Sequence, residues 1–349
     1  MPRRFLIVRT SAIGDVVFAS GLPAAIRHSH PDAHIAWLVE PGIDGLLLPD
    51  PNIDEIILWP KAQWAQLWRS GHKLALWQQV RQLRHTLRQR HFDVALDLQG
   101  LLKSGLLTWL SGAGERIGLG SKEGSQWLMT RTWPRGGDKA LIGSEYRFLA
   151  EQLGLDTTAF APQLWVSPDT ETRVQTLLAQ HGLAVGRYAV LAPFTTRPQK
   201  HWFEDAWRVL LPRIQHELGL TPVVLGGPAD QTAATRITQG VDGVVSLVGA
   251  TRLPEAAGVI RHAGLLVGVD TGLTHMGTAF RVPTVAIFGS TVPYTRTGHA
   301  NGRVIWLGLT CSPCRRRPTC HGAHTCLRDI TPERVLAEAR DVLASESTP

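Results

Sequence analysis

Short apolar runs alternate with longer amphipathic stretches along the whole chain. In the first half these runs occupy residues 5–9, 34–39, 54–58 and 92–98, and in the second half 188–193, 222–227, 244–249, 264–269 and 283–289. The runs are continuously apolar, which is typical of strands buried on both faces of a parallel sheet. Strands that alternate with helices predict doubly wound α/β sheets, and two sets of them predict two Rossmann-like domains.

A cluster of turn-forming residues between Gly154 and Asp169 separates the two sets of strands. It interrupts any regular element, so we place the interdomain linker there. The expected domains are residues 1–160 and 161–330. The remaining residues, 331–349, are expected to form a helix that Thr331 caps and that Pro332 begins.

The composition is that of an ordinary soluble protein. Of 349 residues, 44% are apolar and 19% are charged, which excludes a disordered or coiled-coil chain. No run approaches the ~18 apolar residues of a membrane span, so neither a signal peptide nor a transmembrane helix is expected. Four cysteines are too few for a disulfide-stabilised secreted fold. The sequence therefore predicts a cytoplasmic protein, and its net charge of +7 attracts anions.

The segment 59–91 is rich in Lys and Arg, contains no Asp or Glu, and carries Trp59, Trp64, Trp68 and Trp77. One interpretation is a solvated basic face over a tryptophan-rich core contact. The other is a surface for anionic lipid headgroups or a phosphorylated glycan, since indole suits the interface and cations pair with phosphate. No recognised nucleic-acid-binding motif accompanies the segment, so no nucleic acid partner is expected.

The first strand is followed by the segment TSAIGD, in which Gly14 permits a tight turn and Asp15 begins the next helix. This position is at the carboxyl edge of the sheet, where ligands bind. Asp15 either caps the helix or serves as a general base. The segment lacks the G-x-G-x-x-G of dinucleotide sites, which argues against an oxidoreductase.

Two segments of the second half combine hydroxyl groups, cations and a helix start. Thr271 and Gly272 offer backbone amides where a phosphate is expected at a helix N-terminus, although Asp270 and Thr271 could simply cap the helix. The loop 194–202 contains two threonines and two cations in six positions. Together the segments predict a diphosphate clamp.

All four cysteines fall in one short stretch, at Cys311, Cys314, Cys320 and Cys326. The cluster either binds a structural zinc or iron ion or contains reduced thiols or a disulfide pair. The chain has no Asp-x-Asp, no Walker P-loop and no G-x-S-x-G motif, which disfavours Walker-type ATP hydrolysis and α/β-hydrolase catalysis.

Four segments in chain order resemble glycosyltransferase family 9, the lipopolysaccharide core heptosyltransferases. They are TSAIGD ending at Asp15, DLQGLLKS from Asp97, FTTRPQKHW from Phe194 and VDTGLTHMGTAF from Val269. The QGLLKS and TTRxxKHW segments most resemble the heptosyltransferase I type, and the cysteine stretch with CLRDITPERV is more like the heptosyltransferase II type.

The resemblance implies a GT-B fold, with two Rossmann-like domains facing across a cleft and the C-terminal helix packing back toward the first domain. It implies an inverting enzyme that needs no metal for chemistry and that transfers heptose from ADP-heptose to Kdo-lipid A or inner-core lipopolysaccharide. Such an enzyme is expected at the cytoplasmic face of the inner membrane, in peripheral contact with anionic lipid.

The resemblance also assigns roles to individual residues. Asp15 matches the catalytic base, and Lys200 is expected to stabilise the leaving diphosphate. The implied donor site contains Thr195, Thr196, Lys200, Asp230, Asp270, Thr271, Gly272 and His275. The implied acceptor site contains Gly14, Lys61, Arg69, Lys73 and Lys103.

Two other functions remain open from the sequence. One is a different nucleotide-sugar enzyme on the same fold, such as a non-hydrolysing epimerase. The other is a protein that binds nucleotide sugar or anionic membrane without catalysis. The combination of Asp15, Lys200 and His275 favours an enzyme.

Overall fold

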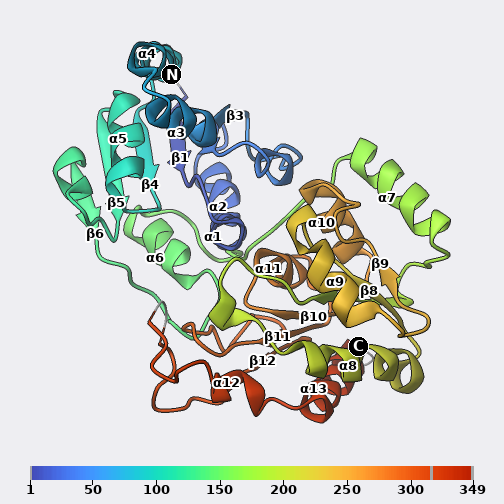
Figure 1. Ribbon diagram of the computed structural model, residues 1–349. Coiled ribbons are helices and arrows are strands. Elements are labelled where there is room, and N and C mark those ends of the chain that lie inside the picture. The colour runs from blue at the N-terminus through green and yellow to red at the C-terminus, as the bar shows by residue number, and fades with distance from the viewer. Residues whose placement is uncertain (1, 315–316, 347–349) are drawn as a thin grey trace. The chain divides into compact units, whose positions relative to one another are not determined.

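The structure is a computed structural model that describes residues 2–314 and 317–346, and it divides into two α/β units (Figure 1). The first unit comprises the residues up to Lys139 and Gly143–Trp165. The second comprises Ala140–Ile142 and the residues from Val166 onward. The chain passes to the second unit between Trp165 and Val166, within the segment where the sequence places the linker.

The first unit contains a six-stranded parallel sheet in the order β3-β2-β1-β4-β5-β6. Its strands are β1 Arg4–Val8, β2 His34–Val39, β3 Glu55–Leu58, β4 Val94–Asp97, β5 Glu115–Leu119 and β6 Arg131–Trp133. Its helices are α1 Ile13–Ala19, α2 Leu22–Ser29, α3 Lys61–Arg69, α4 Lys73–Arg88, α5 Leu102–Leu110 and α6 Ser144–Gln152, with short 3-10 turns η1 Asp44–Leu46 and η2 Ser125–Leu128.

Strand β1 shows why its sequence is continuously apolar. Phe5 and Ile7 pack into one core cluster with α1, α2 and α6, whereas Leu6 and Val8 pack into another with α4 and α5. Successive side chains of a strand point to opposite faces, and here both faces are covered by helices.

The second unit repeats the architecture with the order β12-β11-β10-β7-β8-β9, all strands being parallel. Its strands are β7 Tyr188–Ala192, β8 Thr221–Val224, β9 Val245–Ser246, β10 Leu265–Val269, β11 Thr284–Ile287 and β12 Gly302–Ile305. Its helices are α7 Pro168–Gln180, α8 Glu204–Leu218, α9 Gln231–Thr238, α10 Leu253–Arg261, α11 Gly272–Ala279, α12 Thr325–Arg328 and α13 Pro332–Glu346, with short 3-10 turns η3 Pro198–Lys200 and η4 Pro228–Asp230.

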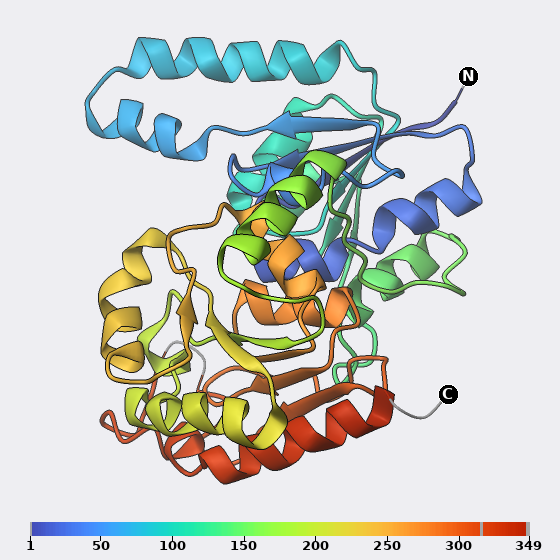
Figure 2. The same cartoon turned by 90° about the vertical axis from the view of Figure 1, so that its right-hand side faces the viewer.

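Helices cover both faces of this second sheet. Helix α8 contacts α9 and α13, and α10 contacts α7 and α11 (Figure 2). The C-terminal helix α13 packs against α8 and strands β10, β11 and β12, all within the second unit. The expected packing of this helix toward the first domain stays a prediction.

The strand order fixes where loops can form a binding site. In each sheet the order reverses at the first strand, between β1 and β4 in the first unit and between β7 and β10 in the second. Ligands of doubly wound sheets bind beyond the carboxyl ends of the strands at this switch point. The loops after β1, β4, β7 and β10 are therefore the relevant ones.

The predicted pair of Rossmann-like sheets is confirmed, with two differences of detail. The short strands β5, β6 and β12 were not predicted, because they carry polar residues such as Arg116, Arg131 and Arg303 and lack a continuous apolar run. Pro168 was interpreted as a breaker, but it begins α7 after the Ser167 cap, where a missing N–H costs nothing. Within the described residues, no helix is long and apolar enough to cross a membrane.

Candidate active site

Asp15 lies in the third position of α1, beyond the carboxyl end of β1. Its carboxylate forms an ion pair with the Arg9 guanidinium, and its side chain is 40% exposed. The cap contact from the Ala12 N–H to the carboxylate is long, at 3.4 Å. The ion pair, more than the cap, orients Asp15, and its exposure leaves one side of the carboxylate accessible.

Arg9 is itself fixed by the neighbouring strands. It is buried, and its Nη1 donates to the Leu98 carbonyl at 2.9 Å. Its own carbonyl accepts from the Trp37 indole at 3.0 Å. The guanidinium therefore links the loop after β1 to the loop after β4 and provides Asp15 with a rigid partner.

The loop after β4 is shaped by Asp97, which is fully buried. One carboxylate oxygen accepts from the backbone N–H groups of Gln99 and Gly100, both at 3.0 Å. Burial raises the pKa of Asp97 despite these hydrogen bonds. Gln99 in turn accepts from the Thr10 hydroxyl at 2.9 Å, which ties the two switch-point loops together.

The structure divides the predicted acceptor residues into two groups. Gly14 adjoins Asp15 in α1, and Lys61 pairs with Glu40 at 3.0 Å. Burial, and after it the charge of Lys61, lowers the pKa of Lys103, which indicates that the two ammonium groups are close. Glu40 also accepts a long hydrogen bond from Thr10, at 3.4 Å. Lys61 is therefore linked through Glu40 to Thr10, in the segment that joins β1 to α1.

The other two acceptor candidates lie elsewhere. Arg69 ends α3, about 12 Å along the helix from Lys61, because each residue adds 1.5 Å. Lys73 begins α4 and stacks over the Trp68 ring at 5.8 Å. Arg69 and Lys73 thus belong to the distal end of the α3–α4 pair rather than to the neighbourhood of Asp15.

In the second unit, Asp270 is the centre of the predicted clamp. It follows β10, and its carboxylate pairs with Lys200 Nζ at 2.6 Å and with His275 Nε2 at 3.2 Å. The Thr291 hydroxyl donates to it at 2.5 Å. Burial opposes ionisation of Asp270, but His275 and then Lys200 outweigh it and hold its pKa well below the usual range.

The loop after β7 meets the loop after β10 at this carboxylate. The Thr195 hydroxyl and Lys200 Nζ both donate to the Asp270 carbonyl at 3.4 Å. His201 Nε2 contacts the Thr195 carbonyl at 2.8 Å and stabilises the bend of the loop. Thr195, Lys200, Asp270 and His275 are therefore brought together, as the clamp requires.

The remaining donor candidates border this group. Thr271 is the N-cap of α11 without a side-chain cap bond, and Gly272 begins the helix, so the first-turn amides remain unused by capping side chains. Such a helix start favours an anion. Thr196 is exposed. Asp230 ends the turn η4 after β8, the strand beside β7, and accepts from the Gly227 N–H at 2.9 Å.

Sequence reasoning missed several partners of these residues. Tyr294 is buried and its hydroxyl lies 3.0 Å from His275 Nδ1, and burial raises the pKa of the Tyr294 phenol. Thr291 and Arg9 each follow a central strand, β11 and β1, so their position at strand ends is a signal that could have found them. Tyr294 carries no comparable signal, because it lies in the irregular loop after β11, 19 residues from His275 in the chain.

The four cysteines are free thiols, with Cys311 exposed and Cys326 buried against the core. Cys320 Sγ lies 3.7 Å from His324 Nδ1. Burial raises the pKa of Cys314 and of Cys326. In the described part of the chain, no group of three or more metal-ligating side chains is arranged to hold an ion. The structural zinc or iron stays a prediction.

Comparison with known proteins places these features in one family. The model of glycosyltransferase family 9 (heptosyltransferase) matches residues 80–324. Lipopolysaccharide heptosyltransferase 1 of Escherichia coli (strain K12) is 27% identical, with 86% of this chain and 92% of that protein covered. Lipopolysaccharide heptosyltransferase 2 of the same strain is also 27% identical, with 98% and 99% covered.

The structural comparison agrees. The solved E. coli ADP-heptose lps heptosyltransferase II is 25% identical over 99% of this chain and 100% of that chain, with a TM-score of 0.76. The likeness covers both units and confirms the predicted GT-B fold class. The equal identity to types 1 and 2 leaves the predicted closeness to the first type unresolved.

Proposed function

Because the chain belongs to glycosyltransferase family 9, the heptosyltransferases, we propose that it transfers heptose from ADP-heptose to the Kdo or inner-core region of lipopolysaccharide. The observation that carries this proposal is the meeting of Lys200, Asp270, His275 and the start of α11 at the switch point of the second sheet. A cation beside a helix N-terminus is suited to a diphosphate. The names of the relatives supply the donor and the acceptor class.

The proposed reaction is a direct displacement with inversion. Asp15 accepts the proton of an acceptor hydroxyl while that oxygen attacks the anomeric carbon, and the bond to the diphosphate breaks. The leaving ADP gathers negative charge, which Lys200, the Thr195 and Thr196 hydroxyls and the first amides of α11 stabilise. Each placed donor of this kind contributes about 3 kcal/mol in the transition state.

Lys200 must change partner for this to happen. Asp270 neutralises the Lys200 ammonium group at 2.6 Å. A bound diphosphate competes for the same ammonium group, while His275 and Thr291 continue to hold the Asp270 carboxylate. The proposed chemistry uses these groups without a catalytic metal.

The test of the proposal is a transfer assay with ADP-heptose and heptose-deficient lipopolysaccharide. Asp15→Asn is expected to lower kcat by about 10² to 10⁴, since it removes the base and keeps the shape. Asp169→Asn, an exposed carboxylate in the first turn of α7, is the matched control and should leave kcat unchanged. Near-normal transfer by a folded Asp15→Asn protein would refute the assigned base.

The same assay separates the rival functions. An epimerase converts the nucleotide sugar when no acceptor is present, whereas a transferase needs the acceptor to release ADP. A protein that only binds would retain the donor tightly and give no product in either case. Acceptor-dependent ADP release with a new glycosidic bond is the result we expect.

We also propose that the α3–α4 pair contacts anionic membrane. The structure splits the tryptophans of this segment, since Trp59 is buried while Trp68 and Trp77 are 64% and 53% exposed. Lys73 and Arg81 stack on these exposed rings at 5.8 and 4.6 Å. Exposed indoles beside cations fit the headgroup region of an anionic bilayer.

Helix α5 extends this surface. Leu102, Leu106 and Trp109 are 43–45% exposed and recur at the spacing of one helix face. Helix α5 contacts α4, and both pack into the core cluster on one face of the first sheet, so their exposed residues belong to that side of the first unit.

Co-sedimentation with vesicles that contain phosphatidylserine tests the membrane contact. The double variant Trp68→Ser, Trp77→Ser should bind at least tenfold more weakly, and wild-type binding should weaken with added salt. Trp165→Ser, a half-exposed indole outside α3–α5, is the control. Equal binding of the double variant and the wild type would exclude this surface.

A further inference from the structure

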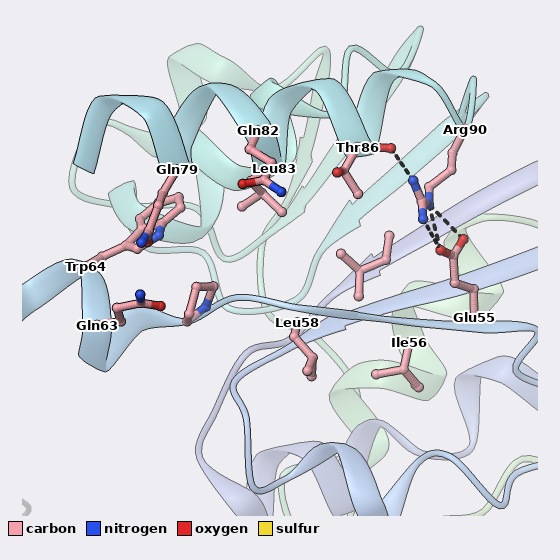
Figure 3. A pocket seen from close by; sticks show the side chains of 12 residues that line it. Glu55, Ile56, Leu58, Gln63, Trp64, Gln79, Gln82, Leu83, Thr86 and Arg90 are labelled. Carbon is pink, nitrogen blue, oxygen red and sulfur yellow. Dashed lines mark hydrogen bonds and ion pairs between the residues drawn. The ribbon is translucent and has the colours of Figure 1, made fainter. Parts of the chain in front are cut away.

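The first unit contains a pocket that the proposed reaction does not use. It has a volume of about 400 Å³ and lies between α3, α4 and strand β3, as Figure 3 shows. This volume is within the range of small-molecule sites, roughly 300 to 1,000 Å³. Strand β3 is the edge strand of the sheet, with β2 between it and β1. The pocket is therefore separate from the switch point where Asp15 lies.

Two buried polar atoms of residues that line it have no hydrogen-bond partner among the described residues. They are the Trp64 indole N–H, a donor, and Gln79 Oε1, an acceptor. Gln79 comes from α4 and Trp64 from α3, so they reach the pocket from facing helices (Figure 3). Buried polar groups are nearly always paired, and an unpaired donor and acceptor in one cavity call for a ligand that supplies both.

The charges of the pocket are already paired. Arg90 donates from Nε to the two Glu55 carboxylate oxygens at 2.7 and 2.9 Å. Burial opposes ionisation of Glu55, but Arg90 outweighs it and lowers the Glu55 pKa. The lining thus presents no free charge, and its other polar groups are the amides of Gln63 and Gln82 and the Thr86 side chain. This argues against phosphate or carboxylate and for a neutral ligand.

The apolar part of the lining completes the description. Ile57 and Leu83 supply aliphatic carbon beside the Trp64 ring, since the three pack in one core cluster. A hydroxyl group both donates and accepts, and a sugar ring adds an apolar face that packs on indole and aliphatic carbon. We infer that this pocket is a binding site for a neutral glycosyl unit, held by the Trp64 N–H and Gln79 Oε1. The site stands independently of the proposed transfer reaction.

The test uses the full-length protein labelled with ¹⁵N and follows the Trp64 indole N–H resonance, which is assigned by its loss in Trp64→Phe. The probes are methyl glycosides of glucose, mannose and N-acetylglucosamine, with inorganic phosphate and cyclohexane as charged and apolar comparisons. At least one glycoside should shift the resonance saturably, and phosphate should not. A sugar unit of the acceptor glycan and a free sugar share this chemistry, so a second titration with delipidated core oligosaccharide distinguishes these sources.

Gln79→Met separates a binding role from a structural one. The variant removes a buried unpaired acceptor, so its melting temperature should equal or exceed that of the wild type, while glycoside binding weakens about threefold to tenfold. Gln78→Met, on the exposed side of α4, is the control and should change neither. Unaltered glycoside binding by Gln79→Met, an indole resonance that no glycoside shifts, or a response to cyclohexane alone would each overturn the inference.

Discussion

At the scale of single residues, Asp270 accounts for the shape of the donor loop. Four groups from two loops and helix α11 converge on it: Lys200, His275, Thr291 and, through the carbonyl, Thr195. Its side chain is only 14% exposed, so the ammonium and imidazole groups replace water as its partners. The protein's own groups therefore hold this carboxylate in place.

Replacement of Asp270 should destabilise the fold as well as the site. In Asp270→Asn the half-buried Lys200 loses its counter-charge, which we expect to cost about 3 kcal/mol in the free energy of unfolding. Glu204→Gln breaks the exposed pair with Arg236 and should cost less than about 1 kcal/mol. Urea denaturation of both variants measures the difference, and equal losses would contradict the central role of Asp270.

The contribution of Asp270 should also depend on pH. Folding lowers the pKa of Asp270, so its carboxylate stabilises the protein fully above the unfolded value of about 3.9. That stabilisation is lost as the pH falls through the lower folded value. The stability gap between the wild type and Asp270→Asn should therefore be constant near neutrality and shrink below about pH 4. A gap that widens on acidification would show that another group dominates.

The sequence was sufficient to place these residues near each other but not to pair them. Lys200 and Asp270 each follow a predicted strand, and the carboxyl ends of adjacent parallel strands share one edge. The pairing of Arg9 with Asp15, or of Tyr294 with His275, depends on rotamers and on irregular loops. Such contacts have no periodic signal in the chain.

At the scale of elements, continuous apolar runs predicted the strands correctly. The prediction failed for strands that are short or that carry polar residues. Strand β2 was predicted with its observed limits, because its residues 34–39 are nearly all apolar. Strand β6 has three residues, Arg131–Trp133, and only Trp133 is apolar. The sequence pattern alone did not show which tryptophans of residues 59–91 are buried and which are exposed. That depends on how α3 and α4 pack against β3.

The loop between β4 and α5 depends on a glycine. Gly100 has φ +69°, and a Cβ atom there would lie 2.6 Å from the Gly120 carbonyl oxygen. Gly71, between α3 and α4, has φ +76° with nothing within 4 Å of the same position. Both Ala variants bear the cost of positive φ, about 1 kcal/mol, but only Gly100→Ala adds a backbone clash.

We therefore expect Gly100→Ala to destabilise the protein by about 2 kcal/mol more than Gly71→Ala. Chemical denaturation of the two variants measures this difference in the free energy of unfolding. The cost of the positive φ angle is common to both variants and cancels. Equal destabilisation would mean that β4 and β5 separate easily at this point. The Asp97 and Gln99 contacts that shape the loop argue against such freedom.

At the scale of the whole molecule, each unit has its own hydrophobic core. One cluster joins β7, β10, β11 and β12 with α8 and α13, and separate clusters fill the two faces of the first sheet. Domains with separate cores unfold as distinguishable components in calorimetry. Gly100→Ala should lower the unfolding temperature of the first unit, and Asp270→Asn should lower that of the second. Each variant therefore identifies the calorimetric transition of its own unit.

These markers allow the proposed donor site to be assigned to one unit. ADP at a hundredfold excess over its Kd stabilises the state that binds it by about 2.7 kcal/mol. If the diphosphate binds at Lys200, ADP should raise the midpoint temperature of the unfolding transition that Asp270→Asn lowers. Lys200→Met should abolish most of this increase. Lys122→Met, an exposed lysine of the first unit, should retain the full response. An ADP response confined to the transition that Gly100→Ala lowers would place the diphosphate in the first unit and refute the clamp.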